Sequence, residues 1–488
     1  MLFVFQAAFF DSLTCRSVVA LRPVIGSLIA AILLASLAAE HSQAAETVDL
    51  SLAPVVGQTH SVKVAVEVKG ELKLNPDGKE VRKLPMLVQA DLEYVERILE
   101  ASPDLAKIRS VRHYRVADAK MRINESDMQQ SLREDRRCLV SQTRGEESLL
   151  FSPVGPVTRE ELELVDVPGN SALLATILPG KKVKLGDEWK YTDGTIARLL
   201  SLEAVSEQDV IGTLTKMEDD VAILALKGKV SGAVGGVATE IDLSAKVNFD
   251  PKKRAVTWLA LQYTEKRGIG HAQPGYDATI RLRLVVEPTA QPPELSPEAL
   301  AKLPLEAKGD EALLEFRSPQ AGADALLDRR WRVMIDRIDV AILRLIDRGD
   351  LIAQCNITRL PSLPKGEHHP LAAFQKDVEK TLGKNFGQIV EAGQATNENG
   401  IRVLKVTVSG FSSELPIQWI YYHLSDAAGR RASVVITLEE KLAERFAGID
   451  GQLIANLKLL DLPTDEEKSP TPAEEPKAAA AKSSRKKK

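Results

Sequence analysis

Cysteine is scarce in this sequence. The 488 residues contain three cysteines, Cys15, Cys138 and Cys355. No two of them have the spacing of a metal knuckle or of a C-x-x-C redox pair, so the sequence does not indicate a cysteine-based metal or redox site. If Cys15 leaves with the amino terminus, a Cys138–Cys355 disulfide remains open as the one intramolecular pairing.

The sequence also lacks a strong charge of either sign and the common catalytic motifs. The formal net charge is −4, which gives no reason to expect nucleic acid as a partner. The patterns G-x-x-x-x-G-K-[ST], G-x-S-x-G and H-E-x-x-H do not occur. We therefore predict no catalytic, cofactor-binding or metal-ligating residues and no cofactor, so that the protein is not an enzyme. An unrecognised hydrolase with scattered residues is an alternative.

The amino terminus, residues 1–44, has the features of a secretory signal peptide. Arg16 and Arg22 precede an uninterrupted apolar run at 24–39, and small residues at Ser42 and Ala44 suit cleavage after Ala44. The apolar run is slightly short for a membrane span. We predict an exported protein, periplasmic or extracellular, and an uncleaved membrane anchor at the amino terminus is the alternative.

Hydrophobic residues make up 44% of the chain and charged residues 27%, which is typical of globular proteins. The length fits two domains and tails. The region 45–288 alternates between apolar and polar residues in segments bounded by turn residues, which predicts an antiparallel β-rich domain. The expected strands are 61–74, 83–99, 110–123, 137–142, 147–151, 210–217, 222–230, 238–249, 255–266 and 278–286, with turns at Asn75–Gly78 and Arg144-Gly145.

Two helices are predicted within this β-rich domain. Thr158 and Glu161 form a capping box, and Asp193 is the expected N-cap of a helix over 195–202. Long strands that are apolar mainly on one face indicate a strongly curved sheet. Its concave side could hold an apolar ligand or be filled by side chains of the two helices, and we favour the filled arrangement.

Residues 289–310 are rich in proline and predict an interdomain linker with one short helix, for which Ser296 is the N-cap. The region 311–460 predicts a second domain. Its expected strands are 326–335, 340–347, 351–360, 388–396 and 402–409, followed by a hairpin over 415–438. A helix is expected from Pro370, with Leu371, Phe374, Val378 and Leu382 on one face. A last helix is expected from the capping box Thr437–Glu440, with Leu442, Phe446, Ile449, Leu453 and Leu457 on one side.

The hairpin over 415–438 is the clearest structural signal. Its first strand carries Ile417, Trp419 and Tyr421 on one face and Ile420, Tyr422 and Leu424 on the other. Apolar residues on both faces predict a strand that is covered from both sides. A turn that includes Gly429 then leads into the return strand.

This second domain resembles the PsbP/Mog1-like α/β/α fold. The resemblance covers residues 311–460 and depends on the element order, on the segment Pro416–Tyr422 and on the Gly429-Arg430 turn before an apolar strand. It implies an antiparallel sheet flanked by helices and a role in binding protein partners, with no shared catalytic set. The region 45–288 resembles exported planctomycete-type proteins, which bears on the compartment only.

Several residues that could carry chemistry have more ordinary explanations. His368-His369 lacks further metal ligands at a suitable spacing. His423 could be a general base, but without a nucleophile nearby it is better explained as a polar residue near a sheet end, and His60, His113 and His271 are explained in the same way. The glycines at 228, 232, 235 and 236 continue into a strand, which predicts a hairpin turn and not a nucleotide loop. Arg348-Gly349-Asp350 is a strand-to-strand turn.

The carboxyl tail, residues 461–488, is rich in Pro, Glu, Ala and Lys and predicts disorder. It becomes basic at Lys482 and at 485–488, which could contact anionic envelope polymer or lipid weakly; a solubilising tail is the simpler interpretation. Together these features predict an α+β protein: a curved antiparallel β-sheet domain with a few helices, followed by an antiparallel sheet flanked by helices. The expected function is non-catalytic binding or scaffolding of another protein or an envelope component. A carrier of an apolar ligand is the alternative.

Overall fold

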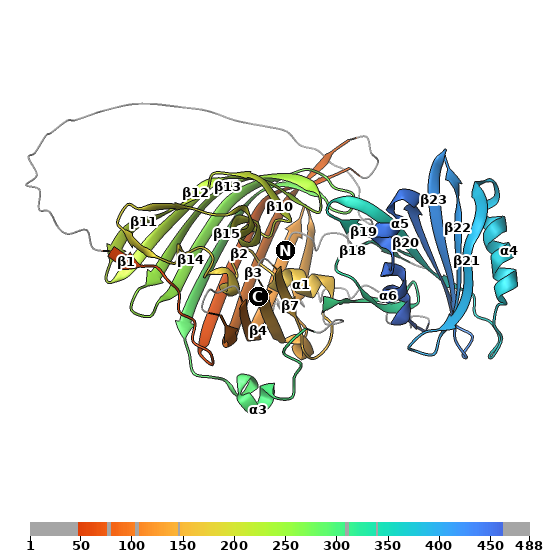
Figure 1. Cartoon of the computed structure of the whole chain (residues 1–488), viewed down its shortest axis with the longest axis horizontal. Coiled ribbons are helices and arrows are strands. Elements are labelled where there is room, and N and C mark those ends of the chain that lie inside the picture. Colours follow the sequence, from red (N-terminus) through yellow and green to blue (C-terminus); the bar gives the residue numbers. More distant parts are fainter. Residues whose placement is uncertain are drawn as a thin grey trace, which may run out of the picture.

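The computed structural model describes residues 47–75, 80–102, 107–144, 147–307, 312–337 and 340–461. Within these residues the chain folds into two parts, side by side along the long axis of the molecule (Figure 1). A 13-stranded antiparallel sheet forms the first part and a seven-stranded antiparallel sheet the second. The predicted signal peptide and the tail beyond residue 461 lie outside the described residues.

The large sheet contains all the long strands that alternation predicted. Its spatial order runs from β7 at one edge to β9 at the other, with β5 and β10 as side branches. The strands are β2 (Thr59–Leu74), β3 (Arg82–Ala101), β4 (Lys107–Ile123), β5 (Ser126–Ser131), β6 (Cys138–Arg144), β7 (Glu147–Phe151), β9 (Glu188–Lys190), β10 (Ala204–Gln208), β11 (Ile211–Glu218), β12 (Val221–Val234), β13 (Val237–Asp250), β14 (Ala255–Arg267) and β15 (Gly275–Pro288).

Five short strands of the first domain were not predicted: β5, β9 and β10, and the separate pair β1 (Thr47–Asp49) and β8 (Lys182–Lys184). The three-residue strands β1, β8 and β9 are too short for alternation to be recognised, and β5 and β10 have few apolar residues to alternate. The expected turns at Asn75–Gly78 and Arg144-Gly145 fall largely outside the described residues.

The register of the large sheet places apolar side chains in continuous rows on one face. One row crosses eight strands without a polar residue, and every member is at least nine-tenths buried. It runs through Ala117, Leu92, Val64, Leu284, Leu259, Val247, Leu224 and Leu214. Neighbouring positions on the other face are mostly polar and exposed. The sheet therefore has one apolar face that needs a cover.

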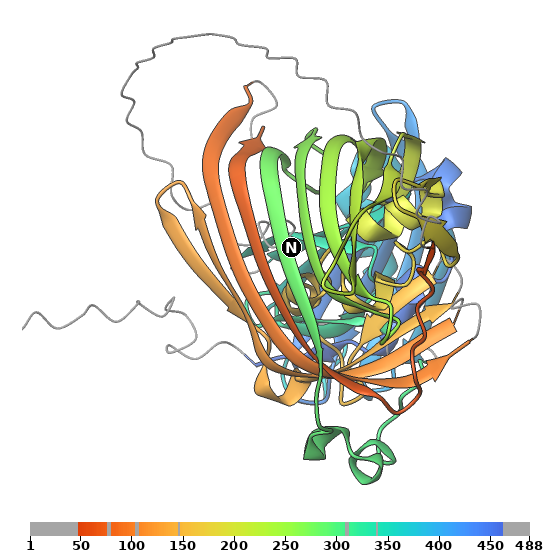
Figure 2. The ribbon, with the colours of Figure 1, turned by 90° about the vertical axis from the view of Figure 1, so that its left-hand side faces the viewer.

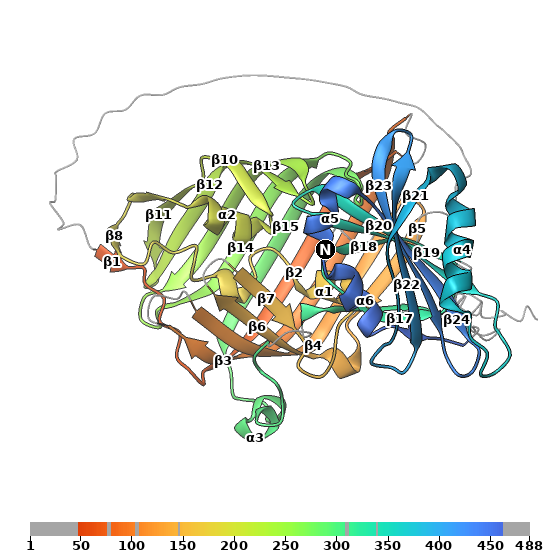
Figure 3. The same cartoon turned by 45° about the vertical axis from the view of Figure 1, so that its right-hand side comes forward.

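Helices and connecting segments cover this face. The chain curves strongly along its strands (Figure 2), and α1 and α2 lie over the strands in Figure 3. α1 (Arg159–Val165) begins at the predicted capping box of Thr158 and Glu161. α2 (Asp193–Leu200) starts earlier than expected: Thr192, not Asp193, is the N-cap, since its hydroxyl accepts a hydrogen bond from the Thr195 amide. Short 3-10 turns lie at Glu134–Arg136 (η1) and Ser171–Leu173 (η2).

The proline-rich segment packs against the sheet. It contains η3 (Pro293–Leu295) and α3 (Pro297–Leu300), and α3 has the predicted Ser296 cap and Pro297 at its first position. Leu295 and Leu300 are buried in a small apolar cluster with Val95 and Phe151. The described part of this linker is therefore anchored on the first domain.

The seven-stranded sheet has the order β18-β19-β20-β24-β23-β22-β21. Its strands are β18 (Trp331–Arg337), β19 (Val340–Asp347), β20 (Asp350–Leu360), β21 (Phe386–Thr396), β22 (Arg402–Ser412), β23 (Leu415–Ser425) and β24 (Arg431–Glu439). A separate small sheet combines β16 (Leu314–Ser318), β17 (Ala323–Leu327) and β25 (Lys458–Leu459).

The single strand predicted over 326–335 is wrong. It divides into β17 and β18, which belong to different sheets. Asp328 causes the break, because its carboxylate accepts hydrogen bonds from the backbone amide and the guanidinium of Arg330 at 2.8 and 2.9 Å. Such a local side-chain-to-backbone bond favours a turn over a strand.

Both faces of β23 are covered, as the sequence predicted. Ile417 and Trp419 pack against α4 (Leu371–Leu382), the helix at the outer edge in Figure 1. Ile420, Tyr422 and Leu424 belong to the core on the opposite face. The apolar stripe of α4 also appears as expected, with Phe374, Val378 and Leu382 buried and Leu371 partly buried against the same cluster.

The last predicted helix is wrong in its start and its continuity. Thr437 does not cap it, because this residue pairs within the sheet with Trp419 and Gln354. The segment forms three short pieces, η6 (Glu440–Leu442), α5 (Ala443–Phe446) and α6 (Ile449–Ala455), since Gly448 takes φ 83° and interrupts the helix. Four of the five predicted apolar residues are nevertheless buried, and Leu442 is only half-buried.

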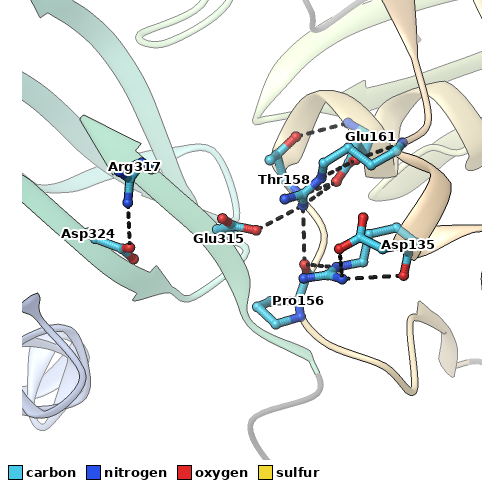
Figure 4. A network of polar contacts seen from close by, with 9 residues as sticks. Asp135, Pro156, Thr158, Glu161, Glu315, Arg317 and Asp324 are labelled. Atoms are coloured by element: carbon cyan, nitrogen blue, oxygen red, sulfur yellow. Dashed lines mark hydrogen bonds and ion pairs between the residues drawn. The ribbon is translucent and has the colours of Figure 1, made fainter. Parts of the chain in front are cut away.

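Arginine side chains join the two domains. The guanidinium of Arg133 donates to both carboxylate oxygens of Glu161 and, at 2.8 Å, to Glu315 of β16 (Figure 4). Glu315 also donates its amide to the Val157 carbonyl. Arg329 reaches back to the Leu150 carbonyl at 2.7 Å.

Two glycine turns also meet across the boundary. Gly236, in the β12–β13 turn, and Gly349, in the β19–β20 turn, approach so closely that neither has room for a Cβ atom. Both have positive φ, 66° and 84°. Glycine is therefore required at these positions by the backbone conformation and by the contact.

We expect Trp419→Ala to destabilise the second domain by about 3–5 kcal/mol, because it removes a buried aromatic side chain from a two-sided core. Urea denaturation followed by circular dichroism measures this loss. Phe411→Ala is the matched control: Phe411 is 60% exposed, and its loss should change the free energy of unfolding by less than about 0.5 kcal/mol. Equal effects of the two variants would contradict the two-sided burial of β23.

Candidate ligand-binding site

A cavity of about 390 Å³ lies on the apolar face of the large sheet, at the end where β2 begins and β3 finishes. Its volume is within the range typical of small-molecule sites. Most of its walls are apolar, with a few polar side chains among them. The apolar residues include Leu52, Pro54, Ile98, Ile108, Leu174, Val256 and Val286, and the polar ones include Gln58, His60, Glu96 and Ser110.

A buried ion pair stands at the wall of this cavity. Glu96 and Arg112 are directly opposite on β3 and β4, and their side chains are only 6% and 1% exposed. Arg112 Nε donates to Glu96 Oε1 at 2.8 Å, and the Ser110 hydroxyl donates to the same oxygen at 2.7 Å. Removing two charges from water is costly, so the pair depends on these additional hydrogen bonds.

The same arginine holds the segment that closes the cavity. Arg112 Nη2 donates to Asn170 Oδ1 at 3.2 Å and to the Ser171 hydroxyl at 3.1 Å. The Tyr94 hydroxyl also lies 2.9 Å from the Ser171 hydroxyl. Since η2 starts at Ser171 and Leu174 lines the cavity, this network fixes the position of the covering segment over the sheet.

Burial acts on the pKa values of the two titratable residues at the wall in opposite directions: it favours a higher pKa for Glu96 and a lower pKa for His60. Although burial opposes ionisation of Glu96, Arg112 and Ser110 hold its pKa below the ordinary value. Burial lowers the pKa of His60, against a weaker opposing effect of Glu96. At neutral pH the site therefore presents an anion that is already paired and a neutral imidazole.

Sequence analysis did not select Glu96 or Arg112, but a signal for them exists. Glu96 follows Leu92 and Tyr94 at every second position, and Arg112 lies between Ser110 and Tyr114 in the same way. Both charges are thus in phase with buried positions of their strands. A charged residue in the apolar phase of a strand predicts a buried, paired group.

A larger hollow of about 900 Å³ lies on the polar face of the same sheet. The hollow runs along two rows of cross-strand neighbours. Small side chains, such as those of Ala65 and Ala260, lie at its centre. Its walls are mostly exposed charged and polar residues that face water, among them Asp91, Lys246 and Arg283. The smaller cavity encloses apolar surface and is the better candidate for a small molecule.

The structure brings His423 next to the pair His368-His369, from which sequence analysis had treated it separately. The ring of His423 lies 5.4 Å from that of His369 and 5.7 Å from that of Phe374, measured between centroids. His368 Nδ1 is 3.2 Å from the Ser425 hydroxyl, and His369 Nε2 is 2.9 Å from Asp377. In the described chain, no group of three or more His, Cys, Asp or Glu residues has the geometry of a metal site.

His423 is buried and uncharged. Its exposed fraction is 4%, and neither ring nitrogen has a hydrogen-bond partner. Burial, with repulsion from Arg431, His369 and Arg402, lowers its pKa to about 4. Among the described residues, neither ring nitrogen is hydrogen-bonded to a nucleophile or an acid, although Ser433 is the cross-strand neighbour of His423.

The remaining candidates are structural. Gly235 and Gly236 form the β12–β13 hairpin turn that the sequence predicted, and Arg348-Gly349 forms the β19–β20 turn. Cys138 and Cys355 are free thiols and do not form the disulfide that had been left open. Burial raises the pKa of Cys138 to about 11, so that thiol is protonated at neutral pH.

No helix among the described residues has the length and apolar character needed to cross a bilayer. Comparison with protein-family models and with curated proteins finds no match. Among solved structures, the chain is similar to PsbP of the cyanobacterium Synechocystis at 12% identity, covering 32% of this chain and 99% of that one, with a TM-score of 0.24.

Two further solved structures cover more of the chain. A BenF-like porin from Pseudomonas fluorescens has 9% identity over 78% of this chain and 98% of that one, with a TM-score of 0.12. Kievitone hydratase from Nectria haematococca has 7% identity over 80% and 91%, also with a TM-score of 0.12. At such scores these likenesses carry no argument about fold or function.

We expect Glu96→Gln to destabilise the first domain by about 3–5 kcal/mol, because it leaves the buried Arg112 without its counter-charge. Because the folded-state pKa of Glu96 is below 4.5, the ionised carboxylate stabilises the fold above pH 4.5, and this contribution is lost as pH falls through the folded-state pKa. The wild type should lose stability over that acid range more steeply than the variant.

Urea unfolding at a series of pH values measures both effects. Glu93→Gln, on the same strand, is the control, since Glu93 is 44% exposed and contacts Lys63 only at 3.7 Å. Its effect should stay below about 1 kcal/mol. A Glu96 variant as stable as this control would rule out the buried pair.

Proposed function

We propose that the protein is an exported, non-catalytic binding protein whose first domain takes up an apolar molecule with one polar end. The cavity of about 390 Å³ supports this proposal, because it interrupts an apolar face that is filled elsewhere. Its apolar walls suit a hydrocarbon or aromatic body. Gln58, His60 and Arg254 at its rim offer hydrogen bonds to a polar end.

The Glu96–Arg112 network favours binding over chemistry. Its charged atoms are paired with one another and with Ser110, Asn170 and Ser171. A rigid, satisfied wall reduces the entropy that a site must lose when a ligand binds. A reaction centre would instead need a group that is free to exchange protons or to attack.

We propose that the second domain is PsbP/Mog1-like and contacts a protein partner. The order of its elements, three strands, α4, then two hairpins and a terminal helical segment, supports the resemblance. Phe411 and Leu415, at the tip of the β22–β23 hairpin, are 60% and 54% exposed. Exposed apolar residues at a hairpin tip suit contact with another protein or an envelope component.

Filling the cavity tests the binding function. We expect 1-anilinonaphthalene-8-sulfonate, an apolar probe with one anionic end, to bind the mature chain at one site with a rise in fluorescence. Ala175→Trp, which places a large ring in the cavity, should weaken this binding at least tenfold. Ala301→Trp, at an exposed position of the linker, is the control and should leave binding unchanged. Equal binding by both variants would refute the site.

Export is tested separately. In a Gram-negative host we expect the full-length chain to reach the periplasm and its mature form to begin at Ala45, because cleavage after Ala44 removes the apolar run. Cell fractionation with mass spectrometry of the amino-terminal peptide measures this. Replacement of Leu33 and Leu34 by Arg, which interrupts the apolar run, should retain the chain in the cytosol. Recovery of the intact wild-type chain from the cytosol would contradict export.

A further inference from the structure

A third cavity, of about 240 Å³, lies between the two domains. The first domain contributes Glu163 of α1, Tyr263 of β14 and Gln273 before β15. The second domain contributes Arg332 of β18. The site thus exists only when the domains are in contact.

Several buried polar atoms at this cavity lack partners. Glu163 is 6% exposed, and among the described residues neither of its carboxylate oxygens accepts a hydrogen bond; Arg159 Nη1 lies 3.5 Å from its Oε1. Gln273 is 9% exposed, and its Oε1 has no donor. Arg332 Nε has no acceptor. Buried polar groups are paired in the great majority of cases, so this convergence within the described chain indicates a bound guest.

One wall of the cavity is already satisfied and rigid. Glu265 Oε1 accepts from the Thr239 hydroxyl at 2.7 Å and from Arg267 Nε at 2.9 Å. The Arg267 guanidinium also stacks on the ring of Tyr276 at 4.7 Å. The unmatched groups are therefore not a consequence of loose packing around the site.

The side chains that lack hydrogen-bond partners differ in charge. Glu163 and Gln273 offer acceptors, which suit an ammonium group with its three donors. Within the described residues, the guanidinium of Arg332 donates to the backbone carbonyls of Arg329 and Trp331 and to no carboxylate, so it suits a carboxylate ligand. Burial and repulsion from Arg159 lower the pKa of Arg332 to about 10, which an anionic guest would reverse.

We propose that the interdomain cavity binds a small aliphatic amino acid, with its ammonium group against Glu163 and Gln273 and its carboxylate against Arg332. The volume equals that of roughly eight water molecules, which suits a guest of this size. Apolar side chains complete the lining and would contact an aliphatic side chain. They include Val66, Val68, Leu162, Leu200, Val234 and Ile280. A neutral polyol would offer neither an anion to Arg332 nor an ammonium group to Glu163.

Isothermal titration of the full mature chain with L-leucine and L-valine tests the proposal. We expect one binding site per chain for at least one of them. The matched probes are 4-methylvalerate, which lacks the ammonium group of leucine, and isoamylamine, which lacks its carboxylate. Each should bind at least tenfold more weakly, and glycerol should not bind.

Variants locate the site. Glu163→Gln keeps the shape but removes the charge and should weaken amino-acid binding at least tenfold, and Gln273→Met, which removes the other acceptor, should weaken it in the same direction. Glu160→Gln, on the same helix but outside the cavity, is the control and should bind as the wild type does. Circular dichroism and the unfolding temperature establish that each variant is folded.

Three results would overturn the proposal. One is the absence of binding by both amino acids, which would mean that the cavity holds water only. Another is binding of glycerol or of a one-charge analogue as tight as that of the amino acid. The third is amino-acid binding that neither Glu163→Gln nor Gln273→Met weakens.

Discussion

The unbroken apolar face of the large sheet is the constraint on which the rest of the structure depends. Rows such as that through Leu92, Val64 and Leu284 cross strand after strand, and hydrophobic burial requires each row to be covered. The chain meets this requirement with short helices and loops between β7 and β10. Such a cover has irregular ends, and the cavity lies at one of them, beneath η2. The cavity is thus a product of how the apolar face is covered.

Ion pairs of buried and partly buried side chains hold the covering segment and the two domains in place. Within the first domain, Glu96 and Arg112 neutralise each other and hold the covering segment. Between the domains, Arg133 is shared by Glu161 and Glu315, so one guanidinium links the start of α1 to β16. Truncating one partner of such a network leaves a costly unpaired charge. The two domains are therefore held in a defined arrangement, which the linker alone would not impose.

The sequence predicted most of the strands, because alternation is a local property of a long strand. The hairpin over 415–438 is the clearest case: apolar residues on both faces of its first strand already indicated two covering layers. The division at Asp328 was missed, since it depends on hydrogen bonds of a single side chain, and several strands were missed because they are short. The pairing of Glu96 with Arg112 depends on register, and two bulges between β3 and β4 shift that register in a way that spacing does not reveal. The contact of His423 with His369 and the interdomain cavity arise from tertiary packing.

The position of β2 has a consequence for biosynthesis. This strand comes first among the long strands, yet it lies in the middle of the sheet and pairs on one side with β15, whose last residue is Pro288. More than two hundred residues of chain separate these partners, so the centre of the sheet forms only after almost the whole domain has been synthesised. Contacts of such long range fold slowly. A nascent chain that stays open until this late stage can be threaded through a translocation channel before its core closes.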